Sequence, residues 1–205
     1  MTIAINIRGT GGSGKSTLVK KVMGLYTKRH NYMVPGRRRP MGYILDRKWG
    51  DKPTVLGEAG LLFVPGHYET ACGGCDTIKT PDEVYRLVNE YTMAETPVLY
   101  EGIMIMDDVT RAVALNRHLI EAGKYRISVD GLYVIALTTP IEECLAGIRE
   151  RRAARGEEKP LNEKNTRQRH ERMLRGLQRL KEAGVAVERL DREAAFIRIK
   201  ELLGV

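Results

Sequence analysis

Long apolar runs, cysteine and repeated segments are scarce or absent in this chain of 205 residues. No run reaches eighteen apolar residues, so no membrane-spanning helix is expected. The three cysteines are too few for a disulfide framework, and residues 1–6 are typical of a strand and not of a secretory signal. These absences predict a cytoplasmic protein that binds no membrane.

Positive charge is in excess, with a formal net charge of +8. Most of this excess lies within residues 149–181, which hold twelve Lys or Arg side chains and five Glu side chains. Such a basic segment indicates a polyanionic partner, either nucleotide phosphates or nucleic acid. The alternative is a solvated helix face, on which pairs four residues apart, such as Glu163 with Arg167, neutralise part of the charge. A second basic run, residues 37–39, lies in an expected loop.

Strand-like and helix-like patterns alternate along the chain. Short apolar runs predict strands over residues 2–7, 41–47, 53–58, 98–101, 131–137 and 185–190. Caps, prolines and periodic apolar residues predict helices over residues 15–29, 81–95 and 110–122, one that begins at 140, a long one that ends near 184, and one over 192–203. This alternation predicts an α/β fold with a mainly parallel sheet, and the length suits a single domain over residues 1–205.

Residues 9–16, Gly-Thr-Gly-Gly-Ser-Gly-Lys-Ser, fit the pattern G-x-x-x-x-G-K-[ST] at every fixed position, between a predicted strand and a predicted helix. Glycines let the backbone turn its N–H groups toward a phosphate, and the start of the helix adds its positive dipole end. The motif predicts that the chain binds ATP and Mg²⁺, with Lys15 on the β- and γ-phosphates and Ser16 on the metal. The predicted cofactor-binding residues are Gly11, Gly12, Ser13, Gly14, Lys15, Ser16 and Thr17.

Three regions of the chain resemble the P-loop kinases of nucleosides and nucleotides. They are the phosphate-binding loop, the strand end Val-Leu-Tyr-Glu-Gly at residues 98–102, and residues 132–155, which are similar to a strand, a Pro-initiated helix and an arginine lid. The resemblance implies the three-layer sandwich of the P-loop NTPases, with a mainly parallel five-stranded sheet and a helical, arginine-rich lid at about residues 149–165. It also implies that Glu101 serves the metal together with Ser16.

A second acidic run competes with Glu101 for the metal. Residues 103–108, Ile-Met-Ile-Met-Asp-Asp, look like the acidic strand end of motor ATPases. In that case Asp107 would hold the metal-bound water, and Asp108 would activate a water for hydrolysis. Glu101 is favoured because parallel strands are short, and a strand that ran through both acidic segments would be unusually long.

The arginines of the lid have a clear chemical purpose. Negative charge spreads over the oxygens of a transferring phosphoryl group, and arginine offers planar donors to those oxygens. Closure of a lid also excludes water, which would compete with the acceptor. Arg149 and Arg152, three residues apart and therefore on one helical face, are predicted to be catalytic. The sequence leaves open which of Arg149, Arg151, Arg152 and Arg155 contacts phosphate.

The irregular, polar segment over residues 66–77 is predicted to form the acceptor pocket, because this part of the chain faces the acceptor in P-loop kinases. A hydroxyl that attacks the γ-phosphate needs a carboxylate to orient it and to take its proton. Asp76 is the first candidate for this catalytic role, with Asp46 and Glu69 as reserves. Asp76 could instead be a capping or turn residue.

Other side chains near this segment carry weaker hypotheses. His67, Cys72 and Cys75 could supply three zinc ligands, but a fourth is not evident, so zinc is not expected. Tyr68 or Trp49 could stack on a base, and Tyr68 could equally fill the core.

Residues 66–78, together with the phosphate-binding loop and residues 100–102, look like the small phage-encoded P-loop kinases that act on hydroxymethylated pyrimidine in DNA. This resemblance implies transfer of the γ-phosphate to the 5-hydroxymethyl group of 5-hydroxymethyluracil, with DNA as the partner and the host cytoplasm as the location. Residues 37–39 and 149–181 could then hold a DNA backbone. Two other functions stay open, namely a small-molecule kinase for nucleosides or nucleoside monophosphates and a nucleic-acid-stimulated ATPase that depends on Asp107.

Overall fold

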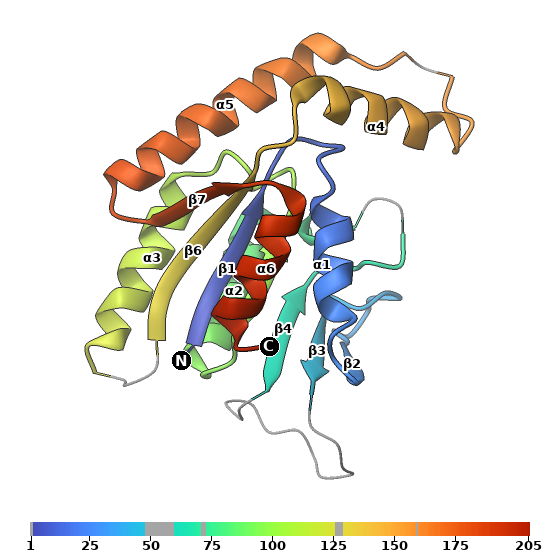
Figure 1. The fold of residues 1–205 in the computed structure, drawn as a ribbon. Helices are drawn as coiled ribbons and strands as arrows, with labels where there is room; N and C mark the ends of the chain where they lie inside the picture. The colour runs from blue at the N-terminus through green and yellow to red at the C-terminus, as the bar shows by residue number, and fades with distance from the viewer. Residues whose placement is uncertain (1, 48–59, 71–72, 126–128, 159) are drawn as a thin grey trace.

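A single seven-stranded sheet runs through the structure, a computed structural model that describes residues 2–47, 60–70, 73–125, 129–158 and 160–205 (Figure 1). Its strands are β1 (Thr2–Arg8), β2 (Lys28–Tyr32), β3 (Gly42–Asp46), β4 (Leu61–Pro65), β5 (Val98–Glu101), β6 (Val129–Leu137) and β7 (Ala186–Leu190). The order across the sheet is β2-β3-β4-β5-β1-β6-β7. The strands from β4 to β7 in this order are parallel, whereas β3 runs antiparallel to both of its neighbours.

The predicted α/β fold with a mainly parallel sheet is confirmed, but the sheet has seven strands instead of the expected five. The helix expected over residues 15–29 ends at Met23, and the residues from Lys28 onward form β2. This edge strand reads Lys-Arg-His-Asn-Tyr and is largely exposed, so no apolar alternation reveals it in the sequence. Strand β4 was also not predicted, although its run of five buried residues is the kind of short apolar run that is consistent with a buried strand. The strand expected over residues 53–58 lies outside the described residues.

Helices cover both faces of the sheet, which gives three layers (Figure 1). They are α1 (Lys15–Met23), α2 (Pro81–Met93), α3 (Thr110–Gly123), α4 (Ile141–Ala153), α5 (Glu163–Glu182) and α6 (Arg192–Leu203). Helices α1 and α6 lie on one face, and α2 and α3 lie on the other. The bounds of α2, α3 and α6 lie within two residues of the predicted ones, because local caps define them. None of the helices in the described ranges has the length and apolar character needed to cross a lipid bilayer.

The sheet separates two apolar cores, and β1 contributes to both of them. Ile3, Ile5 and Ile7 pack with α1 and α6, whereas Ala4 belongs to the core beneath α2 and α3. Successive side chains of a strand point to opposite faces, so a strand buried on both sides is apolar almost throughout. The exceptions in β1 are Thr2, Asn6 and Arg8, and the Asn6 amide donates a hydrogen bond of 3.3 Å to a carbonyl of β5. Strand β1 is therefore held firmly, and the loop that follows it starts from a fixed position.

The carboxyl ends of β1, β4 and β5 meet at one edge of the sheet, and α4 and α5 lie across this edge (Figure 1). Ligands of open parallel sheets bind at this edge, outside the carboxyl ends of the strands. Strand β3 ends at the opposite edge, because it runs antiparallel to β4 and pairs Asp46 with Leu61 at the start of β4. The fold thus brings the phosphate-binding loop and the end of β5 together.

The last residue of β1, Arg8, ties the sheet to the turn that follows β5. Its side chain is fully buried, and its guanidinium donates to the Asn6 amide oxygen at 2.7 Å and to the carbonyls of Met106 at 3.1 Å and Asp108 at 2.9 Å. A buried cation is tolerated only where its donors are satisfied in this way. Arg8 therefore fixes the 103–108 turn beside the carboxyl edge.

We expect Arg8→Met to lower the free energy of unfolding by about 3 kcal/mol, because it leaves three buried acceptors without a donor. Urea denaturation measures this loss as a lower midpoint concentration of urea, with an unchanged slope of the free energy of unfolding against urea concentration. Arg175→Met on the exposed face of α5 is the matched control, since Arg175 makes one exposed ion pair at 3.9 Å with Glu171 and its loss should change stability by less than about 0.5 kcal/mol. Equal effects of the two substitutions would contradict this role of Arg8.

Candidate active site

The phosphate-binding loop joins the end of β1 to the start of α1 and packs directly against α4. Gly12 and Gly14 have φ values of +84° and +91°, a region that residues with a Cβ rarely adopt. A Cβ on Gly12 would lie 2.2 Å from the carbonyl oxygen of Cys144 in α4. Glycine is required there both for the backbone turn and for the close approach of α4.

Lys15, the first residue of α1, turns its side chain back along the loop. Its ammonium donates to the carbonyls of Gly9 at 2.7 Å and Thr10 at 3.1 Å, which leaves one of its three N–H donors for another acceptor. Burial lowers the pKa of this ammonium, and the negative charge of Glu101 opposes the shift. A buried cation at the mouth of a glycine-rich loop is suited to bind a phosphate oxygen.

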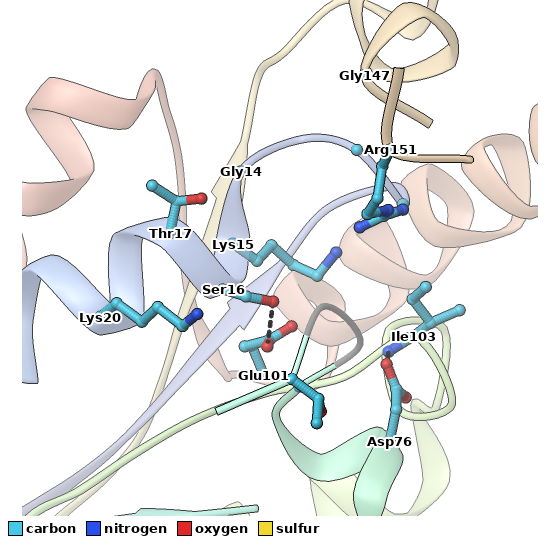
Figure 2. Close-up of a pocket in the computed structure, with 14 residues that line it drawn as sticks. Gly14, Lys15, Ser16, Thr17, Lys20, Asp76, Glu101, Ile103, Gly147 and Arg151 are labelled. Carbon is cyan, nitrogen blue, oxygen red and sulfur yellow. Dashed lines mark hydrogen bonds between the residues drawn. The ribbon is translucent and has the colours of Figure 1, made fainter. Parts of the chain in front are cut away.

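Glu101, the last residue of β5, lies against the start of α1. The Ser16 hydroxyl donates to its Oε1 at 2.8 Å, and the carboxyl is only 2% exposed (Figure 2). Burial raises the pKa of Glu101, while the nearby charge of Lys15 counteracts part of that rise. A hydroxyl and a carboxylate at this separation are the hard oxygen ligands that Mg²⁺ prefers, and a divalent cation would neutralise the buried carboxylate. These residues fit a magnesium ion.

Gly74, which the sequence analysis did not select, makes room for Glu101. A Cβ on Gly74 would lie 2.2 Å from Oε1 of Glu101, and one on Gly66 would lie 2.2 Å from the carbonyl of Gly74. Gly74 also forms an isolated antiparallel bridge with His67. The loop after β4 therefore folds back on itself against the metal-ligand candidate, and the Gly-Gly pair in the sequence was the signal for this close approach.

Asp76 is placed at a turn and also at the pocket, and its catalytic role stays a prediction. Its two carboxylate oxygens accept hydrogen bonds from the backbone N–H groups of Ile103 at 2.9 Å and Met104 at 3.0 Å, so it caps the turn after β5 (Figure 2). It also lines the pocket beside Lys15 and Glu101. A carboxylate has about four lone-pair sites, so further acceptor capacity remains for a substrate hydroxyl.

The two reserve carboxylates lie elsewhere. Asp46 ends β3 at the opposite edge of the sheet, because β3 runs antiparallel to β4. Glu69 is exposed and forms an ion pair of 2.8 Å with Arg29. Neither lines the pocket that contains Lys15, so Asp76 is the candidate that the structure brings to the phosphate-binding loop.

The pocket at the carboxyl edge has a volume of about 340 Å³ (Figure 2). Of the predicted cofactor-binding residues it is lined by Gly11, Gly12, Gly14, Lys15, Ser16 and Thr17. Ser13 is buried beneath the loop instead, and its hydroxyl has no hydrogen-bond partner among the described residues. The remaining wall comes from the loop after β4, from the end of β5 and from α4.

The arginine that reaches this pocket is Arg151. Arg151 and Gly147 both line it, since residues four apart share a helical face, and Figure 2 shows Arg151 directed from α4 toward Lys15. Arg149 instead pairs with Glu163, and Arg152 pairs with Glu157 at 3.3 Å. The structure therefore places the two arginines predicted to be catalytic away from the pocket, and their roles stay predictions. Sequence spacing correctly grouped Arg149 with Arg152 but gave no sign of which face of α4 meets the loop.

The second acidic run does not form a strand end. Strand β5 ends at Glu101, and residues 103–107 form a turn. Asp107 pairs with Arg172 at 3.2 Å, and Asp108 pairs with Arg111 at 3.0 Å. Neither carboxylate lines the pocket, so this placement differs from the one that the motor-ATPase alternative requires.

The structure describes some of the residues in the weaker hypotheses around residues 66–77 and leaves others outside its described ranges. Tyr68 is 2% exposed and packs beside Tyr43, as a core residue does. Cys75 is fully buried, with its thiol 3.8 Å from a backbone carbonyl. Cys72 and Trp49 lie outside the described residues. Within the described ranges, no three His, Cys, Asp or Glu side chains are grouped so as to hold a metal ion.

A parallel sheet with a strand, a G-x-x-x-x-G-K-S loop and a helix at its carboxyl edge defines the class of P-loop nucleoside triphosphate-binding proteins. Comparison with known proteins narrows this class. A 5-hmdU DNA kinase of Pseudomonas phage PaMx11 is 43% identical over 202 residues, which cover 97% of this chain and 96% of that protein. The chain therefore belongs to the 5-hmdU DNA kinase family and is a phosphotransferase.

Other similarities are more limited. The 5-hmdU DNA kinases of Delftia phage PhiW-14 and Bacillus phage SP10 are 39% identical over 75 residues and 24% identical over 149 residues, matched over 22% and 21% of their own lengths. Among solved structures, deoxyadenosine kinase from M. mycoides with bound dATP aligns over 98% of this chain and 99% of that one, with 13% identity and a TM-score of 0.42, too low to support an argument. No protein-family model matches the chain.

We expect Glu101→Gln to raise the free energy of unfolding, with a gain that is larger at pH 8 than at pH 5. The pKa of Glu101 is raised in the folded state, so its contribution to stability is present below the unfolded pKa and is lost as the pH rises. Glutamine keeps an acceptor for the Ser16 hydroxyl. Urea denaturation of both proteins across this pH range measures the difference.

Glu182→Gln at the exposed end of α5 is the matched control for Glu101→Gln, because it removes a carboxylate that stays in water. A gain at Glu101 that is constant with pH, or one that also occurs at Glu182, would contradict the effect of burial.

Proposed function

We propose that this protein is an ATP-dependent kinase that transfers the γ-phosphate to the 5-hydroxymethyl group of 5-hydroxymethyluracil in DNA. The observation that carries the proposal is the pocket in which the phosphate-binding loop, Glu101 and Asp76 meet. The membership of the 5-hmdU DNA kinase family supports the choice of acceptor. The location that follows is the cytoplasm of the infected host.

The loop and Lys15 would hold the triphosphate. The backbone N–H groups of residues 11–17 bind the phosphate oxygens, and the free N–H of the Lys15 ammonium binds the β- and γ-phosphates. Ser16 and Glu101 would hold Mg²⁺, which when bound supplies positive charge that neutralises the phosphates. The Glu101 carboxylate is already positioned by Gly74 and the end of β5, so little reorganisation is needed.

Asp76 would act on the acceptor. Its carboxylate, fixed by the two N–H groups of the turn after β5, accepts the proton of the 5-hydroxymethyl hydroxyl while that oxygen attacks the γ-phosphorus. The bond from the γ-phosphorus to the bridging oxygen breaks, and ADP leaves. The products are ADP and a phosphomonoester on the base, and the proton passes from Asp76 to solvent.

The end of α4 and the start of α5 would form the lid over this reaction. Residues 149–153 end α4 and residues 163–165 begin α5, and these two helices lie across the carboxyl edge of the sheet above the phosphate-binding loop (Figure 1). We assign the whole chain, residues 1–205, to one kinase domain with this lid. Arg151 would place its charge next to the transferring phosphoryl group, where charge develops.

Hydrolysis of ATP as the main reaction is less consistent with the site. The alternative requires Asp107 and Asp108 at the triphosphate, but both carboxylates are held by arginines outside the pocket. Transfer to a free nucleoside or nucleotide is distinguished from transfer to DNA by the labelling experiment described next.

We expect label from γ-labelled ATP to appear on an oligonucleotide that contains 5-hydroxymethyluracil and not on the same oligonucleotide with thymine, which lacks the hydroxyl. Glu101→Gln should lower this transfer at least a hundredfold, whereas Asp107→Asn should leave it within about twofold. Counting of the separated DNA measures both. If label appears only on free nucleotide, the function is that of a small-molecule kinase. If phosphate is released to water and this release depends on Asp107, the function is that of an ATPase.

We expect Arg151→Ala to lower kcat for transfer about tenfold to a hundredfold, because it removes a donor from the phosphate pocket. Arg149→Ala and Arg152→Ala are matched controls from the same helix and should each have a smaller effect, since their partners are Glu163 and Glu157. Steady-state kinetics with saturating ATP measures the three variants. A larger loss at Arg149 or Arg152 than at Arg151 would show that lid closure exchanges the arginines at the phosphate.

A further inference from the structure

A second pocket adjoins the triphosphate pocket along α1. It has a volume of about 420 Å³ and is lined by Lys20, Met23, Tyr26, Arg29, Tyr68 and Glu69, together with a glycine. Lys20 lines both pockets, and Glu69 precedes Thr70, which lines the first one. The two pockets therefore share a boundary on two elements, α1 and the loop after β4.

Positive charge gathers around this second pocket from separate parts of the chain. Lys20 lies one helical turn from Ser16, on the same face of α1, and Figure 2 shows it beside the triphosphate pocket. Arg29 comes from β2 and lies over the ring of Tyr43, 4.9 Å from its centroid. Lys20 and Arg29 both line this pocket, and Tyr68 and Glu69 of the loop after β4 line it as well.

The basic surface that the sequence favoured lies on α4 and α5 and carries several ion pairs. Arginines of α4 and α5 make ion pairs in the described structure: Arg149 with Glu163, Arg152 with Glu157, Arg167 with Glu142 and Arg172 with Asp107. Lys20 has no such partner within the described ranges. Ion pairs as exposed as these can exchange for a phosphate, so the feature that distinguishes the second pocket is its position beside the triphosphate pocket, with Lys20 lining both.

We propose that the second pocket binds a backbone phosphate of the acceptor DNA strand, next to the nucleotide that is phosphorylated. Arg29 and Lys20 bind the phosphate oxygens, while Met23 and Tyr26 offer an apolar surface to the adjoining sugar. This assignment rests on the proposed function, since it names how the same site holds its polymeric substrate.

Glu69 regulates this phosphate subsite by competition. Its carboxylate pairs with Arg29 at 2.8 Å and accepts from the Tyr43 hydroxyl at 3.4 Å. The side chains of Arg29 and Glu69 are 49% and 51% exposed, so their ion pair contributes little and exchanges readily for a phosphate. A phosphate must displace Glu69 from Arg29, and removal of the Glu69 charge should therefore tighten DNA binding.

The test compares Arg29→Ala with Arg86→Ala. Arg86 is the matched control, because it makes a similarly exposed pair with Glu90 on α2. Binding of a fluorescent single-stranded oligonucleotide that contains 5-hydroxymethyluracil is measured between about 50 and 200 mM salt. We expect Arg29→Ala to reduce the slope of log affinity against log salt by about 0.7 and to raise the KM for the oligonucleotide about tenfold, with kcat and the KM for ATP unchanged. Arg86→Ala should match the wild type.

For Glu69→Gln only the affinity for the oligonucleotide is measured, and we expect this affinity to increase about threefold or more. It keeps the side chain's size, so it also tests the subsite if Arg29→Ala fails to fold. The subsite is overturned if Arg29→Ala keeps the wild-type salt slope, or if Glu69→Gln weakens binding. If Lys20→Ala raises the KM for ATP while Arg29→Ala has no effect, the positive charge at this pocket serves triphosphate binding, and the subsite is overturned.

A third arm separates a strand from a free nucleoside. The KM for 5-hydroxymethyl-2′-deoxyuridine should not change in Arg29→Ala, because a nucleoside carries no phosphate. An equal rise for nucleoside and oligonucleotide would overturn the assignment to a backbone phosphate. Absence of transfer by the wild type would reject the proposed function, whereas the salt slopes would still decide whether the second pocket binds DNA.

Discussion

The buried carboxylate of Glu101 is the constraint on which the site depends. Pairing of β5 with β1 places it beside Ile7, one residue from the start of the phosphate-binding loop, so the acid and the loop cannot move apart without breaking the sheet. Burial disfavours its charge, and Lys15 and Ser16 offset part of this penalty. Because burial makes the charged form of Glu101 unfavourable, a bound cation would stabilise it. The Mg²⁺ that accompanies a nucleoside triphosphate would supply that cation.

The two loops beyond the sheet are positioned from this centre. The loop after β4 closes on Glu101 through Gly74, and Asp76 then joins this loop to the turn after β5. Arg8 holds that same turn from below. Buried hydrogen bonds of this kind rigidify a site, because each lost partner leaves an unsatisfied group. The acceptor side of the pocket is thus built on the same framework as the triphosphate side.

Sequence reasoning succeeded where a signal is local. The start of α2 at its cap Thr80, the bounds of α6, the phosphate-binding loop and the end of β5 at Glu101 depend on neighbouring residues, and each was predicted close to its observed place. It failed where the outcome depends on distant parts of the chain. Strand β2 exists because β3 offers it an edge, and its polar sequence carries no period that would reveal this.

The sequence by itself determined the class of chemistry, because the spacing of glycines, lysine and serine in residues 9–16 dictates a backbone that binds phosphate. Tertiary structure alone decided which charges surround that phosphate. Arg151 faces the loop while Arg149 and Arg152 pair with glutamates, and Arg29 lines the second pocket from an edge strand that the sequence did not reveal. Helical spacing says which side chains share a face, but packing between elements selects the face that meets the ligand.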